Sequence, residues 1–136
     1  VGNVFGVFEI IPNLKLRSSY GIDLAYGTNN SFRPLFFLNA AQISSESRVD
    51  KSVDRWFNWI WENTLSYDLG LGSHDFNFLA GTTAQENSYE NLTGGKSDIV
   101  FSDFDNAFLN TAVNEESATA GGGAAQSALL SYFGRV

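Results

Sequence analysis

Residues 57–87 read FNWIWENTLSYDLGLGSHDFNFLAGTTAQEN, and this stretch decides the fold that the sequence predicts. Between residues 57 and 69 most odd positions are apolar or aromatic, whereas most even positions are polar. Such alternation with a period of two is typical of a strand with one apolar face. Gly70–Ser73 is a tight-turn signal, and residues 74–87 then alternate again. The stretch therefore predicts two long antiparallel strands joined by a short turn.

The same alternation occurs in residues 14–27, LKLRSSYGIDLAYG, where the even positions are mostly apolar. It lasts for about fourteen residues, whereas the mean strand of a soluble protein has about 5–6. Weaker strand patterns occupy residues 3–11 and 128–136. We expect the even residues of 14–26 and the odd residues of 57–69 to share one apolar face. A register shift of one residue would move every side chain of a strand to the opposite face of the sheet.

The connections between these strands alternate in length. Pro12-Asn13 and Gly70–Ser73 are short, whereas residues 28–55 and 88–127 are long and rich in polar residues and glycine. Short turns at one rim and long loops at the other are typical of outer-membrane barrels. The sequence thus predicts an all-β fold, an antiparallel meander of about five long strands that is part of a transmembrane β-barrel with long extracellular loops. The strands are expected near 3–11, 14–27, 56–69, 74–87 and 128–136.

Composition narrows the possible functions. The 136 residues carry a net charge of −7 and contain no cysteine. A nucleic-acid partner is not expected, because no basic stripe is available to neutralise phosphates. No enzymatic activity, cofactor or metal site is expected, and no apolar run is long enough for a transmembrane helix. The chain begins at Val1 and ends at Val136 within an apolar run, so we expect a piece of a longer protein.

Three stretches resemble a known family. They are ENTLSYDLGLGSHDFNFLAGTTAQ (62–85), SALLSYFGRV (127–136) and the Leu-Lys-Leu-Arg arm at 14–23. Together they resemble SusC/RagA-type TonB-linked transporters of the bacterial outer membrane. The resemblance implies a barrel of about 22 strands, a plug domain that this chain does not contain, and coupling to the TonB complex. It also implies a SusD-type surface lipoprotein as partner and import of glycans or peptides, without deciding between these cargoes.

Two groups of residues are expected to contact other molecules in such a barrel. Substrate contacts are expected on the long-loop side, from Arg33, Trp56, Phe101, Asp103 and Phe104. Contacts with the plug or with water in the lumen are expected near the short turns, from Lys15, Arg17, Asp68 and Asp75. Lys15 is expected to lie opposite Asp68, where opposite charges stabilise a strand pair by roughly 0.2–1 kcal/mol.

Several motifs have two interpretations. Phe101, Phe104 and Phe108 either bind cargo or pack their loop into the barrel mouth. Asp98, Asp103 and Asp105 have a spacing that can bind Ca²⁺, although a solvated acidic loop is the simpler interpretation. The run Gly121–Ala125 is interpreted as a flexible hinge or a plain linker.

Two other functions compete with the transporter. One is a soluble β-sandwich that binds carbohydrate through its aromatic loops. The other is a soluble hydrolase with paired carboxylates, which is weaker because no acidic pair stands out at the strand ends. A gene that continues with more long alternating strands on both sides would favour the transporter.

Overall fold

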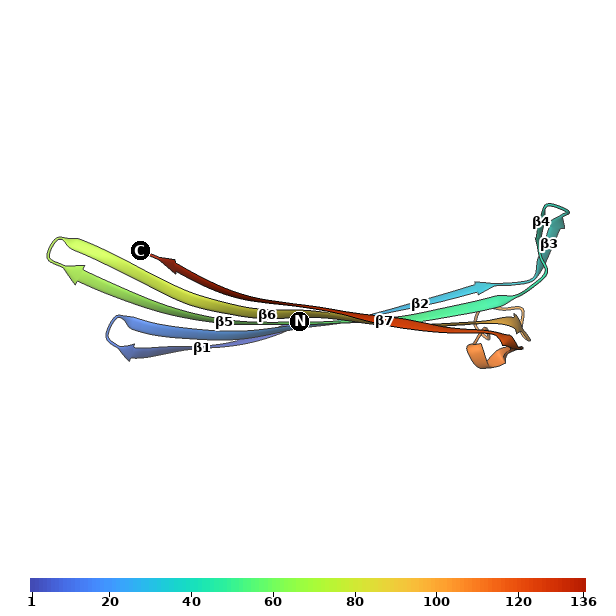
Figure 1. Cartoon of the computed structure of the whole chain (residues 1–136), viewed down its shortest axis with the longest axis horizontal. Helices are drawn as coiled ribbons and strands as arrows, with labels where there is room; N and C mark the ends of the chain where they lie inside the picture. Colours follow the sequence, from blue (N-terminus) through green and yellow to red (C-terminus); the bar gives the residue numbers. More distant parts are fainter. The chain divides into compact units, whose positions relative to one another are not determined.

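The computed structural model describes all 136 residues, and strands dominate it (Figure 1). Five strands form one sheet in the order β1-β2-β5-β6-β7. These strands are β1 (Gly2–Ile11), β2 (Leu14–Arg33), β5 (Arg48–Leu71), β6 (His74–Ile99) and β7 (Ala112–Arg135). The predicted all-β antiparallel meander is confirmed. No helix in the structure is long and apolar enough to cross a membrane.

The two short turns use backbone conformations that suit their residues. Asn13 has a φ of 69° and Gly72 a φ of 65°, a region that glycine adopts freely and asparagine tolerates. The turn at Asn13 sets an antiparallel register in which Gly2 pairs with Ile22 and Val4 with Tyr20. The amide of Asp68 donates a 3.1 Å hydrogen bond to the Asn13 carbonyl, which ties the two hairpins together.

The strands extend far into the segments expected to be long loops. Most of 28–55 and 88–127 is strand, and only residues 34–47 and 100–111 connect β2 to β5 and β6 to β7. The sequence pattern missed this because the backbone ladder continues where alternation between apolar and polar side chains stops. Both interpretations of Gly121–Ala125, as a flexible hinge and as a plain linker, are wrong for the same reason, since this run lies inside β7. A Cβ at Gly122 would lie 2.7 Å from the Asn91 carbonyl oxygen, so glycine here permits close strand approach.

The chain divides into two compact units. Unit 1 comprises Val1–Ala25, Trp56–Tyr89 and Ala125–Val136, and unit 2 comprises Tyr26–Arg55 and Glu90–Ala124. All buried apolar side chains belong to unit 2, where Val49, Ile99, Ala107 and Ala112 form a small core with Phe32 and Leu109 against it. Unit 1 has no buried apolar core.

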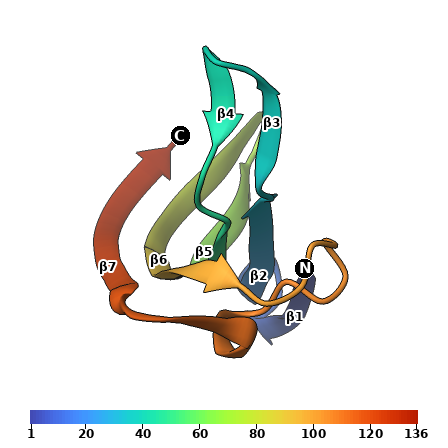
Figure 2. The same ribbon diagram turned by 90° about the vertical axis from the view of Figure 1, so that its right-hand side faces the viewer.

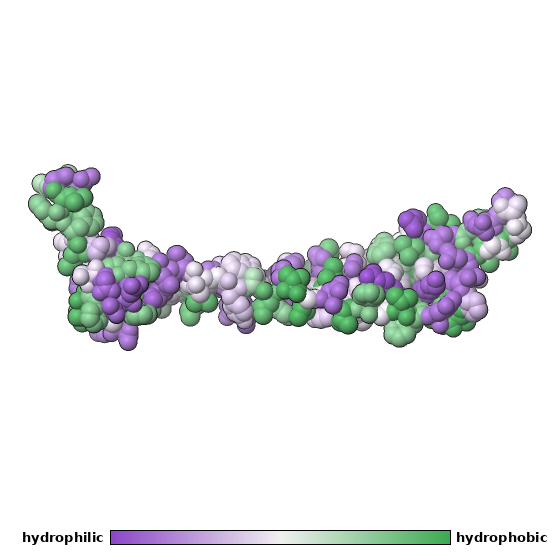
Figure 3. All heavy atoms as spheres, turned by 180° about the vertical axis from the view of Figure 1, so that it is seen from behind, coloured by the Kyte–Doolittle hydropathy of each residue, from purple (hydrophilic) through white to green (hydrophobic).

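Unit 2 also contains a short hairpin of β3 (Phe36–Asn39) and β4 (Gln42–Ser44), which forms a two-stranded sheet of its own (Figure 2). Its large apolar residues are exposed and form a green patch at the upper left of Figure 3. A three-residue 3₁₀ turn, Leu109–Thr111, lies in the β6–β7 connection.

The sheet of unit 1 has one apolar and one polar face. The rings of Tyr20 and Trp59 stack at 6.2 Å, and Trp61 donates a 3.1 Å hydrogen bond to the Ser18 hydroxyl. The even residues of β2 and the odd residues of β5 therefore share a face, as predicted. This apolar face carries mainly the following side chains: Val4, Phe8, Leu16, Tyr20, Ile22, Leu24, Phe57, Trp59, Trp61, Leu65, Tyr67, Leu69, Phe76, Phe78, Ala80, Ala84, Leu130 and Tyr132.

Candidate functional site

A shallow groove of about 340 Å³ lies on the polar face of unit 1. Four strands contribute to it, and we call it the amide groove after its polar residues, which are Asn3, Asp23, Asn58, Gln85 and Asn87. Gly21 pairs with Asn3 across β1 and β2. A Cβ at Gly21 would lie 3.1 Å from Cγ2 of Ile60, so the glycine leaves the space that the groove occupies.

The four amide side chains of the groove form no hydrogen bond within the chain. Each amide offers two donors and an acceptor oxygen. Such groups, when open to solvent and turned toward one depression, can bind a ligand that both donates and accepts hydrogen bonds.

An aromatic pair stands next to the groove. The rings of Trp56 and Tyr89 are 5.4 Å apart with an angle of 34° between their planes. Trp56 precedes Asn58 by two residues on β5, and Tyr89 follows Asn87 by two residues on β6. Alternate residues of a strand point to the same face and are about 7 Å apart. The pair therefore continues the polar face just beyond the amide groove, with Trp56 39% exposed.

Few charged side chains lie in this part of the face. Asp23 is the one charged side chain that lines the groove, which also includes Val1 at the start of the chain. Glu62 follows Ile60 by two residues and lies on the same face.

Trp56 is the one substrate-contact residue of the sequence prediction that lies beside this groove. Arg33 and Phe101 are exposed in unit 2, and the Asp103 carboxylate accepts hydrogen bonds from the backbone and side chain of Asn106. Phe104 lines a separate cavity of about 170 Å³ together with Phe32, Val49, Lys51 and Phe108 among others. Trp56 thus belongs to unit 1, whereas the other four belong to unit 2.

Two of the Phe residues in the β6–β7 connection, Phe104 and Phe108, line a cavity of unit 2. The Lys51 ammonium lies 4.4 Å from the centre of the Phe108 ring, a cation–π contact. No group of three or more acidic or histidine side chains that could hold a metal ion is present, so Asp98, Asp103 and Asp105 are not brought together as a Ca²⁺ site.

The residues expected near the plug lie around the two short turns. Asp68 and Asp75 line one depression of about 420 Å³ with Asn13 and Asn77. Arg17 lies over the Phe5 ring at 5.0 Å.

The expected pairing of Lys15 with Asp68 is wrong. The Asp68 amide hydrogen-bonds to the Asn13 carbonyl at 3.1 Å, so Asn13 and not Lys15 lies opposite Asp68. The Asp68 carboxylate accepts a 2.6 Å hydrogen bond from Asn77, and on the β1 side Lys15 lies opposite Glu9. The sequence could not specify this register between β2 and β5, because the long connection between these two strands imposes none.

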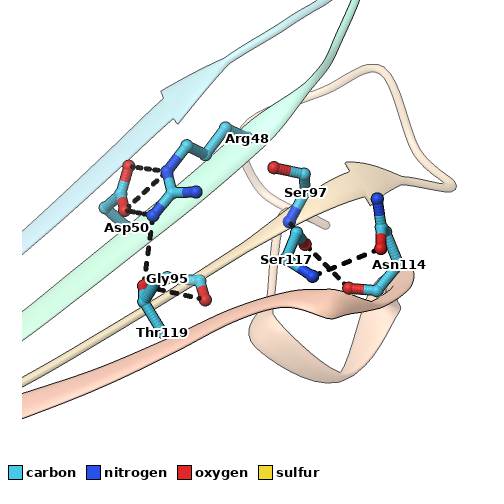
Figure 4. Close-up of polar contacts among 7 residues, drawn as sticks. All are labelled: Arg48, Asp50, Gly95, Ser97, Asn114, Ser117 and Thr119. Carbon is cyan, nitrogen blue, oxygen red and sulfur yellow. Dashed lines mark hydrogen bonds and ion pairs between the residues drawn. The ribbon is translucent and has the colours of Figure 1, made fainter.

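A polar network holds the strands of unit 2 together (Figure 4). Arg48 forms an ion pair with Asp50 at 2.9 Å and donates a 3.1 Å hydrogen bond to the Thr119 hydroxyl, which in turn donates to the Gly95 carbonyl. The hydrogen bonds to Asp50 raise the pKa of Arg48 above its usual value, so the guanidinium remains charged. A Cβ at Gly95 would lie within 2.5 Å of the Asp50 and Arg48 side chains, so this network requires glycine.

The sequence prediction missed the amide groove itself. Its signal was present, because Asn58, Gln85 and Asp23 all fall on the polar side of the alternation. The alternation shows which face of the sheet each residue lies on. It does not show which residues of neighbouring strands lie side by side, because that depends on the register between the strands.

Comparison with known proteins agrees with this fold. No protein-family model matches the chain. TonB-dependent receptor P3 of Formosa agariphila is 24% identical in an alignment of 110 positions that covers 68% of this chain and 11% of that protein. The structure of the RagAB peptide transporter covers 97% of this chain with a TM-score of 0.73 and 22% identity. The RagAB peptide importer matches with a TM-score of 0.72 in both its open-open and its closed-closed state, at 22% and 20% identity.

These matches confirm the resemblance to SusC/RagA-type proteins that the sequence indicated, at the level of the fold. The chain spans 14% of the RagAB chains that it matches. It therefore has the fold of one segment of a much longer protein of this type.

Proposed function

We propose that this chain is part of the wall of a bacterial outer-membrane barrel, in a TonB-dependent transporter that imports glycans or peptides. A SusD-type surface lipoprotein and the TonB complex are its proposed partners, and outer-membrane lipid covers the apolar face of unit 1. The observation that carries the proposal is the length of that face. Apart from Asn63 and Thr82, its side chains are apolar through residues 59–69 of β5 and 76–84 of β6, and a membrane-spanning strand needs about 9–11 residues.

A hydrogen bond marks the end of this apolar stretch. Gln126 donates to the Glu86 carboxylate at 2.7 Å, just past Ala84 on β6 and Ala128 on β7. A polar pair at this level suits a membrane–water interface and would be costly within hydrocarbon. The fold match to RagAB and the similarity to a TonB-dependent receptor support the same function.

The soluble β-sandwich is less consistent with unit 1. A sandwich buries the apolar faces of two sheets against each other. The apolar face of unit 1 has no second sheet against it, and large side chains such as Tyr20, Trp61 and Leu65 are exposed. Lipid would satisfy this surface without further protein.

Two neighbouring positions on β5 test the membrane assignment. In a cysteine-free full-length protein reconstituted in liposomes, Leu65→Cys and Ser66→Cys are each labelled with a fluorophore. Because these residues point to opposite faces, brominated lipid should quench the label at 65 strongly and the label at 66 weakly. Equal quenching at both positions would contradict the proposal. In cells, deletion of the gene or of TonB should abolish uptake of the cargo.

A further inference from the structure

From the cavity of unit 2 that Lys51 and Asp105 line, we infer that this chain has a binding site for a free α-amino acid with a small apolar side chain. The cavity lies between β2, β5 and the β6–β7 connection, and all of its lining residues belong to unit 2. The inference goes beyond the proposed function and does not depend on it.

The first argument is the size of the cavity and the order of its wall. Its volume is about 170 Å³, below the roughly 300–1,000 Å³ of sites for drug-sized ligands, so it admits a small molecule and not a chain of sugars or residues. Val49 and Ala107 of its wall are 1% and 4% exposed. The Thr111 hydroxyl donates a 2.8 Å hydrogen bond to the Phe108 carbonyl and accepts one of 3.1 Å from the Phe108 amide. A wall that is already held in place loses little entropy when a ligand binds.

The second argument is a pair of opposite charges that do not pair with each other. Lys51 and Asp105 line the same cavity, yet neither forms a hydrogen bond or an ion pair. The Lys51 ammonium lies over the Phe108 ring, 4.4 Å from its centre. By contrast, the other lysine of unit 2, Lys96, forms an ion pair with Glu115. A ligand with one anionic and one cationic group satisfies both charges of the cavity at once.

The third argument is the aromatic part of the wall. Phe32, Phe104 and Phe108 line the cavity. A small apolar group that lies against these rings is removed from water, which favours binding. An α-amino acid of this type combines a carboxylate for Lys51, an ammonium for Asp105 and an apolar side chain for the rings.

Equilibrium dialysis of radiolabelled valine against the purified full-length protein tests this inference. The competitors are 3-methylbutanoate, which is valine without its ammonium, and isobutylamine, which is valine without its carboxylate. Each should compete at least tenfold more weakly than unlabelled valine. Lys51→Met keeps the length of the side chain and removes its charge, and it should weaken valine binding about tenfold or more. Asp105→Asn should have an effect of similar size, because each variant removes one charged partner of the ligand.

Two variants outside the cavity are matched controls. Lys96→Met removes the other lysine of unit 2. Asp103→Asn changes a carboxylate of the same connection and keeps an oxygen that can accept the hydrogen bond from the Asn106 amide. Neither residue lines the cavity, so both variants should bind valine as the unaltered protein does. Migration on unheated gels verifies that each variant is folded.

Three results would overturn the inference: no binding of valine, competition by 3-methylbutanoate or isobutylamine as strong as by valine, or valine binding unchanged in both Lys51→Met and Asp105→Asn. The proposed function fails separately. A protein that inserts in membranes and imports cargo with TonB but does not bind valine keeps the transporter and loses the amino-acid site, whereas a protein that does not insert loses the transporter.

Discussion

Glycine at position 81 is required by a ring on the neighbouring strand. A Cβ added there would lie 2.3–2.9 Å from atoms of the Phe133 ring. The ring of β7 thus covers the backbone of β6, where glycine alone leaves room. Ile60 covers Gly21 in a similar but looser way, at 3.1 Å. On this polar face, single glycines determine how closely neighbouring side chains approach the sheet.

We therefore predict that Gly81→Ala destabilises the full-length protein by roughly 1–3 kcal/mol, the usual range for overpacking. The measurement is the midpoint of urea unfolding in lipid vesicles. Gly134→Ala is the control, because its nearest neighbour, the Leu79 carbonyl oxygen, would be at an ordinary 3.5 Å. The double variant Gly81→Ala/Phe133→Ala should regain part of the stability that Gly81→Ala loses, because the ring is no longer present. An unchanged midpoint for Gly81→Ala would show that the ring moves aside without cost.

At the scale of elements, the connection between β6 and β7 is a packed segment. Asp98, the last residue but one of β6, has a φ of 59°. Its amide donates to the Ser47 carbonyl at 2.9 Å, and the amide of Ile99, where β6 ends, donates to the Ser47 hydroxyl at 2.8 Å. Ala107 is 4% exposed within the core of unit 2. These contacts fix a segment that its acidic and polar composition suggested was a solvated loop.

Ala107→Asp should release this segment, because a carboxylate cannot be buried there without a partner. Chymotrypsin cleaves after phenylalanine, and the segment contains Phe101, Phe104 and Phe108. If Ala107→Asp lowers the free energy of local opening of this segment by about 1.4 kcal/mol, chymotrypsin should cleave the variant roughly ten times faster than the unaltered protein. The control variant Asn110→Asp, which introduces a carboxylate at an exposed position, should be cleaved at the rate of the unaltered protein. Equal rates for both variants would mean that the buried contacts do not hold the segment.

At the scale of the whole molecule, the sheet has two open edges. β1 and β7 lie at the ends of the strand order, and each presents unpaired backbone groups to other chains. Many large apolar residues are exposed, including Val4, Phe8 and Tyr132. In a closed barrel, further strands would pair with both edges and lipid would cover the apolar face.

The chain expressed alone should therefore aggregate in water. Size-exclusion chromatography with light scattering is expected to find large assemblies, and detergent should reduce them. The same measurement on the full-length protein in detergent provides the comparison. A monodisperse monomer of the isolated chain, with cooperative unfolding, would favour the soluble binding module.

The sequence by itself determined the strand type, the two short turns and the apolar face. Alternation with a period of two is a local property that is visible along each strand, and the face shared by Tyr20 and Trp59 follows from it. The family resemblance came from local stretches as well. The true strand lengths were not predictable, because outside the apolar stretch nothing forces side chains to alternate.

Only the tertiary structure decided which residues of different strands meet. Asn58 and Gln85 lie on the two arms of one hairpin, whereas Asp23 comes from β2, and the long β2–β5 connection leaves the register between β2 and β5 unspecified. The register brought these residues into one groove beside Trp56 and placed Asn13, not Lys15, next to Asp68. Hydrogen bonds between strands carry this information, and no single strand contains it.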